Sequence, residues 1–177
     1  MSHSVRAATI LDASALAAIH RANWLTLLGP DLPDLEAALD AASLARDWGN
    51  AIVLAAGEGP YAVFVAVDDA DAVVGFAALG PLLDPDGGTG SAELVALWVA
   101  PTAQRQGHGS RLLSQVASAA RSGMNATRLA HWVARQDIYR QRFLRACGFG
   151  ADGAERSWQA PSGELVDEQR WSTRLDL

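Results

Sequence analysis

Residues 92–122 contain the segment that most restricts the fold. AELVALWVA (92–100) is an almost continuous apolar run closed by Pro101, which is typical of a strand buried on both faces. A turn with Gly107 and Gly109 follows, and the next residues place apolar side chains at helical spacing up to Gly123. We expect a helix over about 109–122 that packs on the sheet and returns the chain as a parallel strand.

The flanking segments supply further strands and helices. Alternating or β-branched runs predict strands over 5–10, 61–67, 72–82 and 127–134, and a last hairpin over 156–175 that turns at Pro161-Ser162-Gly163. Helical spacing predicts helices over about 12–28, 32–48 (ended by Gly49-Asn50) and 137–149, while 84–90 is expected to be a mobile connector. The order β-α-α-β-β-β-α-β-α-β-β indicates an α/β (α+β) chain in which an antiparallel meander leads into one parallel crossover.

Composition excludes several classes of protein. A chain of 177 residues is expected to form a single domain over 1–177. It has no run of ~18 apolar residues and no signal-peptide core, so we expect no membrane partner. The single cysteine, Cys147, excludes an internal disulfide and favours a reducing, cytoplasmic location. All 14 basic residues are arginine, which excludes every mechanism that needs a lysine.

The charge is unevenly distributed along the chain. The net charge is −6, yet residues 101–156 hold nine arginines against three acidic residues. A basic third inside an acidic protein favours a local anion site over a nucleic-acid surface, and no basic helix with base-reading residues is present. Solvated arginines on two helices are the other interpretation of the same pattern.

The turn QRQGHG (104–109) is the candidate for that anion site. The first N–H groups of a helix lack internal partners, and glycines let an anion approach the main chain closely. A P-loop is rejected because no lysine follows the last glycine. A dinucleotide fingerprint is rejected because Leu112 occupies the third small position. The spacing that remains is Gln/Arg-x-x-Gly-x-Gly, which a plain strand–helix turn also satisfies.

LWVAPTAQRQGHGSRLL (97–113) resembles the acyl-CoA-binding motif of the GNAT N-acetyltransferase superfamily, and LAHWVARQDIYRQRFLRACGF (129–149) resembles its second motif. The resemblance covers nearly the whole chain. It implies a mixed, mostly antiparallel sheet of about six or seven strands with about four helices and a splayed acyl-CoA cleft. It also implies an enzyme that transfers an acetyl group directly from acetyl-CoA to a primary amine of an unidentified acceptor.

The same resemblance implies which residues hold the coenzyme. Its diphosphate is expected on the turn and helix N-terminus, and its pantetheine arm beside the preceding strand, where the arm satisfies unpaired main-chain groups. Asp137 matches an asparagine that is common in the family, although it also suits a helix cap. The expected coenzyme-binding residues are Leu97, Trp98, Val99, Gln104, Arg105, Gln106, Gly107, His108, Gly109, Ser110 and Asp137.

Catalysis requires a base for the attacking amine and a proton for the departing thiolate. Glu93 stands where several family members carry a general base, which acts directly or through water; a solvent-facing strand-edge residue is the alternative. The family's usual acid is a tyrosine, but here that position is Leu144. Tyr139 is a weak substitute, and the substrate ammonium or water is another proton source.

The resemblance also suggests an acceptor pocket and leaves alternatives open. Trp24 and Trp48 lie in the helices that cover the acceptor site in this family, although core packing also explains them. No metal site is expected, because the histidines and Cys147 lack ligand spacing. Dimers are common in the family, so a homodimer is among the expected partners. A catalytically weak acyl-CoA-binding module, or an enzyme for longer acyl-CoA, fits the same motifs.

Overall fold

The computed structural model describes residues 4–29, 35–160, 163 and 165–176. Its elements are β1 (Ser4–Ala7), the 3-10 turn η1 (Ile10–Asp12), α1 (Ala13–Leu28), α2 (Leu35–Ala38), α3 (Ala41–Ala55), β2 (Ala62–Val67), β3 (Val73–Pro81), β4 (Ser91–Val99), the 3-10 turn η2 (Pro101–Ala103), α4 (His108–Met124), β5 (Arg128–Ala134), α5 (Ile138–Ala146), β6 (Gly150–Gln159) and β7 (Leu165–Arg174). The predicted turn at Pro161-Ser162-Gly163 lies largely outside the described residues.

One seven-stranded sheet connects all the strands in the order β1-β2-β3-β4-β5-β7-β6. The β4–β5 pair is parallel and every other pair is antiparallel. The helix α4 forms the crossover connection between the parallel strands β4 and β5, as the sequence predicted. The mixed, mostly antiparallel sheet expected from the family resemblance is therefore confirmed.

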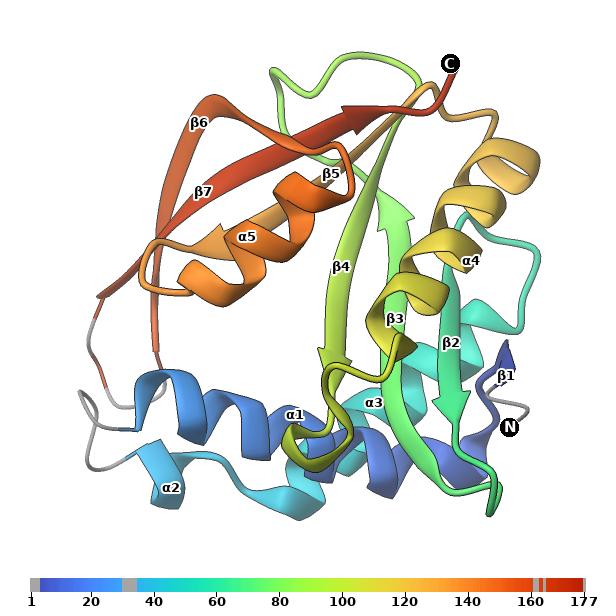
Figure 1. Ribbon diagram of the computed structural model, residues 1–177, viewed down its shortest axis with the longest axis vertical. Helices are drawn as coiled ribbons and strands as arrows, with labels where there is room; N and C mark the ends of the chain where they lie inside the picture. The colour runs from blue at the N-terminus through green and yellow to red at the C-terminus, as the bar shows by residue number, and fades with distance from the viewer. Residues whose placement is uncertain (1–3, 30–34, 161–162, 164, 177) are drawn as a thin grey trace.

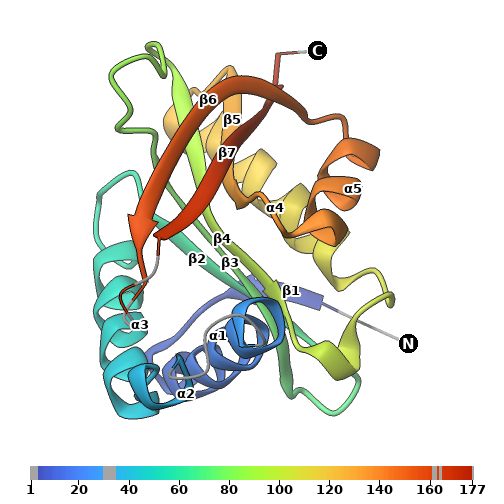
Figure 2. The same ribbon diagram turned by 90° about the vertical axis from the view of Figure 1, so that its left-hand side faces the viewer.

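Helices cover both faces of the sheet (Figures 1 and 2). One core lies under α4 and α5 and includes the fully buried Leu112, Val116 and Leu144. A second core lies under α1 and α3 and includes Leu16 and Phe76. The apolar stripe of α4 thus packs on the sheet as its spacing predicted. Burial of each large aliphatic side chain contributes about 2 kcal/mol to the free energy of folding, which favours this packing.

Two predicted helix boundaries are wrong. The helix expected over 32–48 is split, because Asp40 caps α3 by accepting a 2.6 Å hydrogen bond from the Ser43 N–H. That helix continues through Gly49, where a side chain would stand 3.2 Å from Ile10 Cδ1, so this glycine permits close packing instead of ending a helix. Likewise α4 passes Gly123 and ends at Asn125, which adopts the left-handed conformation with φ of 51°.

The connector between β3 and β4 is tethered to the sheet, contrary to the mobile loop that its composition predicted. Asp84 and Asp86 accept hydrogen bonds of 3.0 and 3.1 Å from Arg170 of β7. Arg170 is buried and also donates to Asp152 at 2.9 Å. Buried charges persist when they are paired and hydrogen-bonded, and here the pairs fix the loop beside β7.

Candidate active site

The parallel strands β4 and β5 separate after three residue pairs. Ser91, Ala92 and Glu93 pair with Arg128, Leu129 and Ala130, and no later pair follows in the described strands. From there β5 stays with β7 and leans away from β4, so that the sheet splays open (Figure 1). A bulge at Val95 accompanies the opening, since Ala78 pairs with Ala96 but Leu79 pairs with Leu94. Beyond Glu93, the edge of β4 lacks a strand partner.

Side chains take over the hydrogen bonds on this edge of β4. The buried His131 of β5 lies with its Nδ1 2.5 Å from the Leu94 carbonyl oxygen, which assigns the proton to Nδ1. Burial, with a smaller effect of the Arg140 charge, lowers the pKa of His131 to about 3, so the ring is neutral. Arg140 of α5 donates to the Leu97 carbonyl. A side chain therefore occupies the main-chain acceptor of Leu97, on the strand where unpaired main-chain groups were expected.

The end of β4 is anchored in the same way. Asn23 Nδ2, from α1, donates to the Val99 carbonyl at 3.1 Å and to the Ile19 carbonyl at 2.8 Å. Gln104 Nε2 donates to the Val99 carbonyl at 3.4 Å. These bonds fix α1 and the start of the turn against the last residue of β4.

The turn after β4 presents main-chain groups to solvent. Residues 104–107 are exposed, and Arg105 and Gly107 adopt left-handed φ of 64° and 83°. A side chain at Gly107 would be strained, and its Cβ would lie 3.2 Å from Arg111 Nη1. His108, the first residue of α4, is buried with 1% of its surface exposed, so the exposed main chain of the turn lies before it. A helix N-terminus next to exposed arginines is a favourable place for an anion.

Arg111 belongs to this turn although sequence reasoning did not select it. It lies in the first turn of α4, and its Nη1 donates to the Gln106 carbonyl at 3.2 Å. The guanidinium group therefore lies next to Gly107, within the region expected to hold phosphate. Its position four residues after a glycine N-cap was the available signal, because i and i+4 side chains share a helix face.

A cavity of about 360 Å³ occupies the splay on the α1 and α3 face of the sheet. Five of the six tryptophans line it. They come from separate elements: Trp24 from α1, Trp48 from α3, Trp98 from β4, Trp132 from β5 and Trp158 from β6. The sixth lies in the core on the other face of the sheet. The volume suits one small organic molecule.

The charged side chains of the cavity are paired with one another. Arg140 Nε binds Asp137 at 2.9 Å, and Arg156 Nε binds Glu168 at 2.7 Å. Each guanidinium also covers a tryptophan ring: Arg140 lies 3.9 Å from the centre of Trp98, and Arg156 lies 4.4 Å from the centre of Trp132. The walls are therefore aromatic and locally neutral.

Glu93 stands at the point where β4 and β5 separate. It is half-buried, and burial is the largest of the effects that raise the pKa of its carboxyl group. The charges that act on it include Arg156 and Glu168, which line the cavity, although Glu93 itself is not part of the described lining. A carboxylate with a raised pKa is a stronger base than an ordinary glutamate.

The stretch of sequence that forms the splayed strands and the glycine-containing helix N-terminus matches a protein-family model. Residues 18–149 match the model of the acetyltransferase (GNAT) family. The chain belongs to the GNAT acetyltransferase family. No curated protein matches the sequence.

Solved structures share the fold of this GNAT acetyltransferase at low sequence identity. The PaiA N-acetyltransferase of Thermoplasma acidophilum, in complex with coenzyme A, has a TM-score of 0.79 at 18% identity, over 98% of this chain and 99% of that one. A ribosomal-protein-alanine N-acetyltransferase of Brucella melitensis has 0.71 at 24%, over 97% and 99%. A phosphinothricin acetyltransferase of Sinorhizobium meliloti with acetyl-CoA has 0.73 at 19%, over 98% and 89%.

The remaining candidate residues of this GNAT acetyltransferase fall into three groups. Trp24 and Trp48 line the cavity. Asp137 lines it too, and caps α5 by accepting a 2.9 Å bond from the Arg140 N–H. Tyr139 is 79% exposed and lies outside the described lining, while Leu144 is fully buried under α4 and α5. Neither of the last two places a proton donor in the cavity.

Sequence reasoning missed most of the cavity. His131, Trp132, Arg140, Arg156, Trp158 and Glu168 all line it, and none was selected from the sequence. These residues are far apart in the sequence, so no local pattern connects them. The residues of β6 and β7 reach the cavity because β7 pairs with β5 in the sheet. The count of six tryptophans was the available signal.

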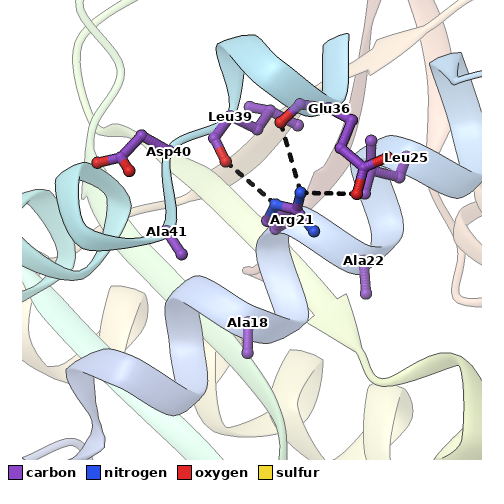
Figure 3. Close-up of a pocket in the computed structure, with 8 residues that line it drawn as sticks. All are labelled: Ala18, Arg21, Ala22, Leu25, Glu36, Leu39, Asp40 and Ala41. Atoms are coloured by element: carbon purple, nitrogen blue, oxygen red, sulfur yellow. Dashed lines mark hydrogen bonds and ion pairs between the residues drawn. The ribbon is translucent and has the colours of Figure 1, made fainter. Parts of the chain in front are cut away.

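A second cavity of about 580 Å³ lies between α1 and the α2–α3 region, away from the splay (Figure 3). Arg21 crosses it and donates to the Leu39 carbonyl at 3.1 Å and the Glu36 carboxylate at 3.0 Å. Its polar groups thus satisfy one another. The bonds of Arg21 across this cavity hold α1 against the α2–α3 region. The cavity lining does not include residues of the glycine-containing turn.

No group of three or more His, Cys, Asp or Glu side chains among the described residues is placed to hold a metal ion. None of the described helices is both long enough and apolar enough to cross a membrane.

Proposed function

We propose that this protein transfers an acetyl group from acetyl-CoA to the primary amine of a small molecule. One observation carries the proposal: a cavity of small-molecule size opens where β4 leaves β5, and β4 leads directly into the exposed turn at the N-terminus of α4. The donor's long arm and the acceptor thus have separate places along one strand.

The turn fits the diphosphate of the coenzyme. Gly107, the N-cap of α4, is exposed and carries no side chain that would cover the first main-chain N–H groups of the helix. Arg105 and Arg111 add positive charge, and Gln104 and Gln106 add exposed amides. The bound thioester supplies the activated acetyl group.

Glu93 is proposed to accept the proton of the acceptor amine. The amine is protonated near neutral pH and attacks only after it loses that proton. Because Glu93 is half-buried and outside the described lining, a water molecule between Glu93 and the cavity is the proposed route. The side chain of Leu144 has no acidic proton to donate, so the departing thiolate takes a proton from water or from the substrate ammonium.

A second candidate function follows from Leu144. A buried leucine stands where the family's proton donor is expected, which favours a catalytically weak module that binds acyl-CoA without rapid turnover. Both functions require the turn to bind the coenzyme. They differ in whether thiol is released when an amine is added.

Calorimetry with acetyl-CoA and with acetyl-pantetheine, which lacks the diphosphate, tests the coenzyme site. We expect acetyl-CoA to bind much more tightly. The variant Gly107→Ala is expected to weaken acetyl-CoA binding about tenfold or more, since it introduces strain at φ of 83°. Gly123→Ala is the matched control on the same helix, because a side chain there meets nothing within 4 Å. Equal affinity for the two thioesters would contradict the diphosphate site.

A thiol-release assay with acetyl-CoA and a panel of amines then separates the two functions. Release that depends on both the coenzyme and an amine supports the enzyme. Tight acetyl-CoA binding without amine-dependent release supports the binding module.

A further inference from the structure

We propose that the acceptor is a monoamine with a flat aromatic body, such as an arylalkylamine, and not a polycationic amine. This inference rests on the proposed acetyl transfer and names the substrate class of the same cavity. It starts from the five tryptophans that line the splay.

Three of these rings have no guanidinium partner in the part of the chain that the structure describes, and they lie on the α1, α3 and β6 side of the cavity. Trp24 and Trp158 meet edge to face with ring centres 4.9 Å apart. Trp48 packs edge to face on Phe76 at 4.7 Å, and its Nε1 donates to His20 Nδ1 at 3.1 Å. Each ring is held by a neighbour, so this wall is pre-organised. Flat aromatic ligands stack on or abut such rings with favourable geometry.

The imidazole of His20 completes the wall without adding charge. It lies between Trp24 and Trp48, with ring centres 5.9 and 5.7 Å away. Burial lowers the pKa of His20 to about 4, so the ring is neutral near pH 7. It therefore extends the aromatic surface without adding a charge.

Among the described residues that line the cavity, no carboxylate is left unpaired for a second ammonium group. The two carboxylates in the described lining, Asp137 and Glu168, are bound to Arg140 and Arg156. Those same guanidinium groups cover Trp98 and Trp132, the other two rings that would attract a cation. A polyamine or aminoglycoside would have to bury further ammonium groups without a partner, and burial of an unpaired charge is costly.

The pairing of the cavity's carboxylates favours a substrate with a single ammonium group. The tryptophan rings of the walls favour a substrate with an aromatic body. The single ammonium of an arylalkylamine is also the reacting group, and it loses its charge when Glu93 takes the proton. The cavity of about 360 Å³ accommodates one such molecule. It does not offer a long groove for an extended peptide.

The test compares kcat/KM for phenethylamine, spermidine, kanamycin and a peptide with an N-terminal alanine, at saturating acetyl-CoA. We expect phenethylamine to exceed each of the others at least tenfold. A preference for any of the other three overturns this inference and leaves acetyl transfer standing. Absence of phenethylamine turnover also overturns it. Failure of acetyl-CoA to bind at all would instead remove the proposed function.

Variants locate the effect in the aromatic wall. Trp158→Ala is expected to raise KM for phenethylamine at least tenfold and to leave the Kd for acetyl-CoA unchanged, which also shows that the protein is folded. Trp171→Phe is the matched control, since Trp171 lies in the core on the opposite face of the sheet. An unchanged KM in Trp158→Ala would overturn the assignment of the wall.

Discussion

Arg140 lies over Trp98, with its guanidinium carbon 3.9 Å from the centre of the indole ring. From this position it donates to the Leu97 carbonyl of β4 and to the Asp137 carboxylate at 2.9 Å. One side chain of α5 thus bridges the splay and occupies an acceptor that the pantetheine arm is expected to use. We propose that the coenzyme and Arg140 compete for the same oxygen.

Replacement of Arg140 should therefore strengthen coenzyme binding. Arg140→Met keeps an unbranched side chain but removes the donor, which frees the Leu97 carbonyl. A net hydrogen bond contributes about 1 kcal/mol, so the Kd for acetyl-CoA is expected to fall about fivefold by calorimetry. Arg142→Met, an exposed change on the same helix, is the control. Weaker binding in Arg140→Met would show that Arg140 contacts the coenzyme.

Glu93 is expected to determine the acid limb of the pH–rate profile. Because burial raises the pKa of its carboxyl group, kcat/KM should begin to fall at a higher pH than an ordinary glutamate would give. Glu93→Gln should remove this limb and lower kcat/KM about 100-fold near neutral pH. Glu155→Gln changes an exposed glutamate of β6 and should leave the profile intact. An acid limb that survives in Glu93→Gln would exclude Glu93 as the base.

The same residue should lower the stability of the protein at neutral pH. A folded-state pKa above the unfolded value means that the stabilising contribution is complete at low pH and is lost as pH rises through the folded pKa. At pH 7 the ionised Glu93 is therefore destabilising, and Glu93→Gln should raise Tm. At pH 4 the difference should disappear. A Tm increase of the same size at both pH values would mean that the carboxylate charge is not the cause.

Arg170 is expected to hold the β3–β4 connector in place and to stabilise the folded protein. Arg170→Met leaves the Asp84 carboxylate without its arginine and leaves Asp152 with Arg128 alone, and loss of one member of a buried ion pair costs about 3 kcal/mol or more. Chemical denaturation should show this loss, and limited proteolysis should show earlier cleavage within 82–90. Arg174→Met removes an exposed pair with Asp176 and should have little effect on either measurement. Equal stability of the two variants would contradict a structural role for the Arg170 cluster.

Asp12 should contribute to stability in a pH window set by its own titration. Arg6 binds the carboxylate at 2.8 and 2.9 Å, which is the main cause of a pKa lowered to about 2. Its contribution is present above the ordinary pKa and is lost as pH falls towards 2. Asp12→Asn should therefore cost about 2 kcal/mol at pH 7 and only a small part of that at pH 2, by denaturation at each pH. The exposed Asp176→Asn serves as the comparison, and a cost in Asp12→Asn that persists at pH 2 would point to packing.

The sequence by itself determined the strand–turn–helix unit at 92–122. The apolar run, Pro101 and the two glycines are local signals, and backbone stereochemistry turns them into β4, the exposed turn and α4 almost without reference to the rest of the chain. The coenzyme-binding candidates were therefore accessible from sequence, apart from Arg111. Helix ends were less accessible, because Gly49 serves packing against Ile10 and not termination.

Only the tertiary structure decided the cavity and its chemistry. After Glu93, β4 no longer pairs with β5. In the opening between the two strands, His131 and Arg140 donate hydrogen bonds to carbonyl groups of β4 instead. The opening also gathers tryptophans from five elements that are up to 134 positions apart, between Trp24 and Trp158. Contacts at such separation depend on sheet order and side-chain packing, which leave no periodic pattern in the sequence.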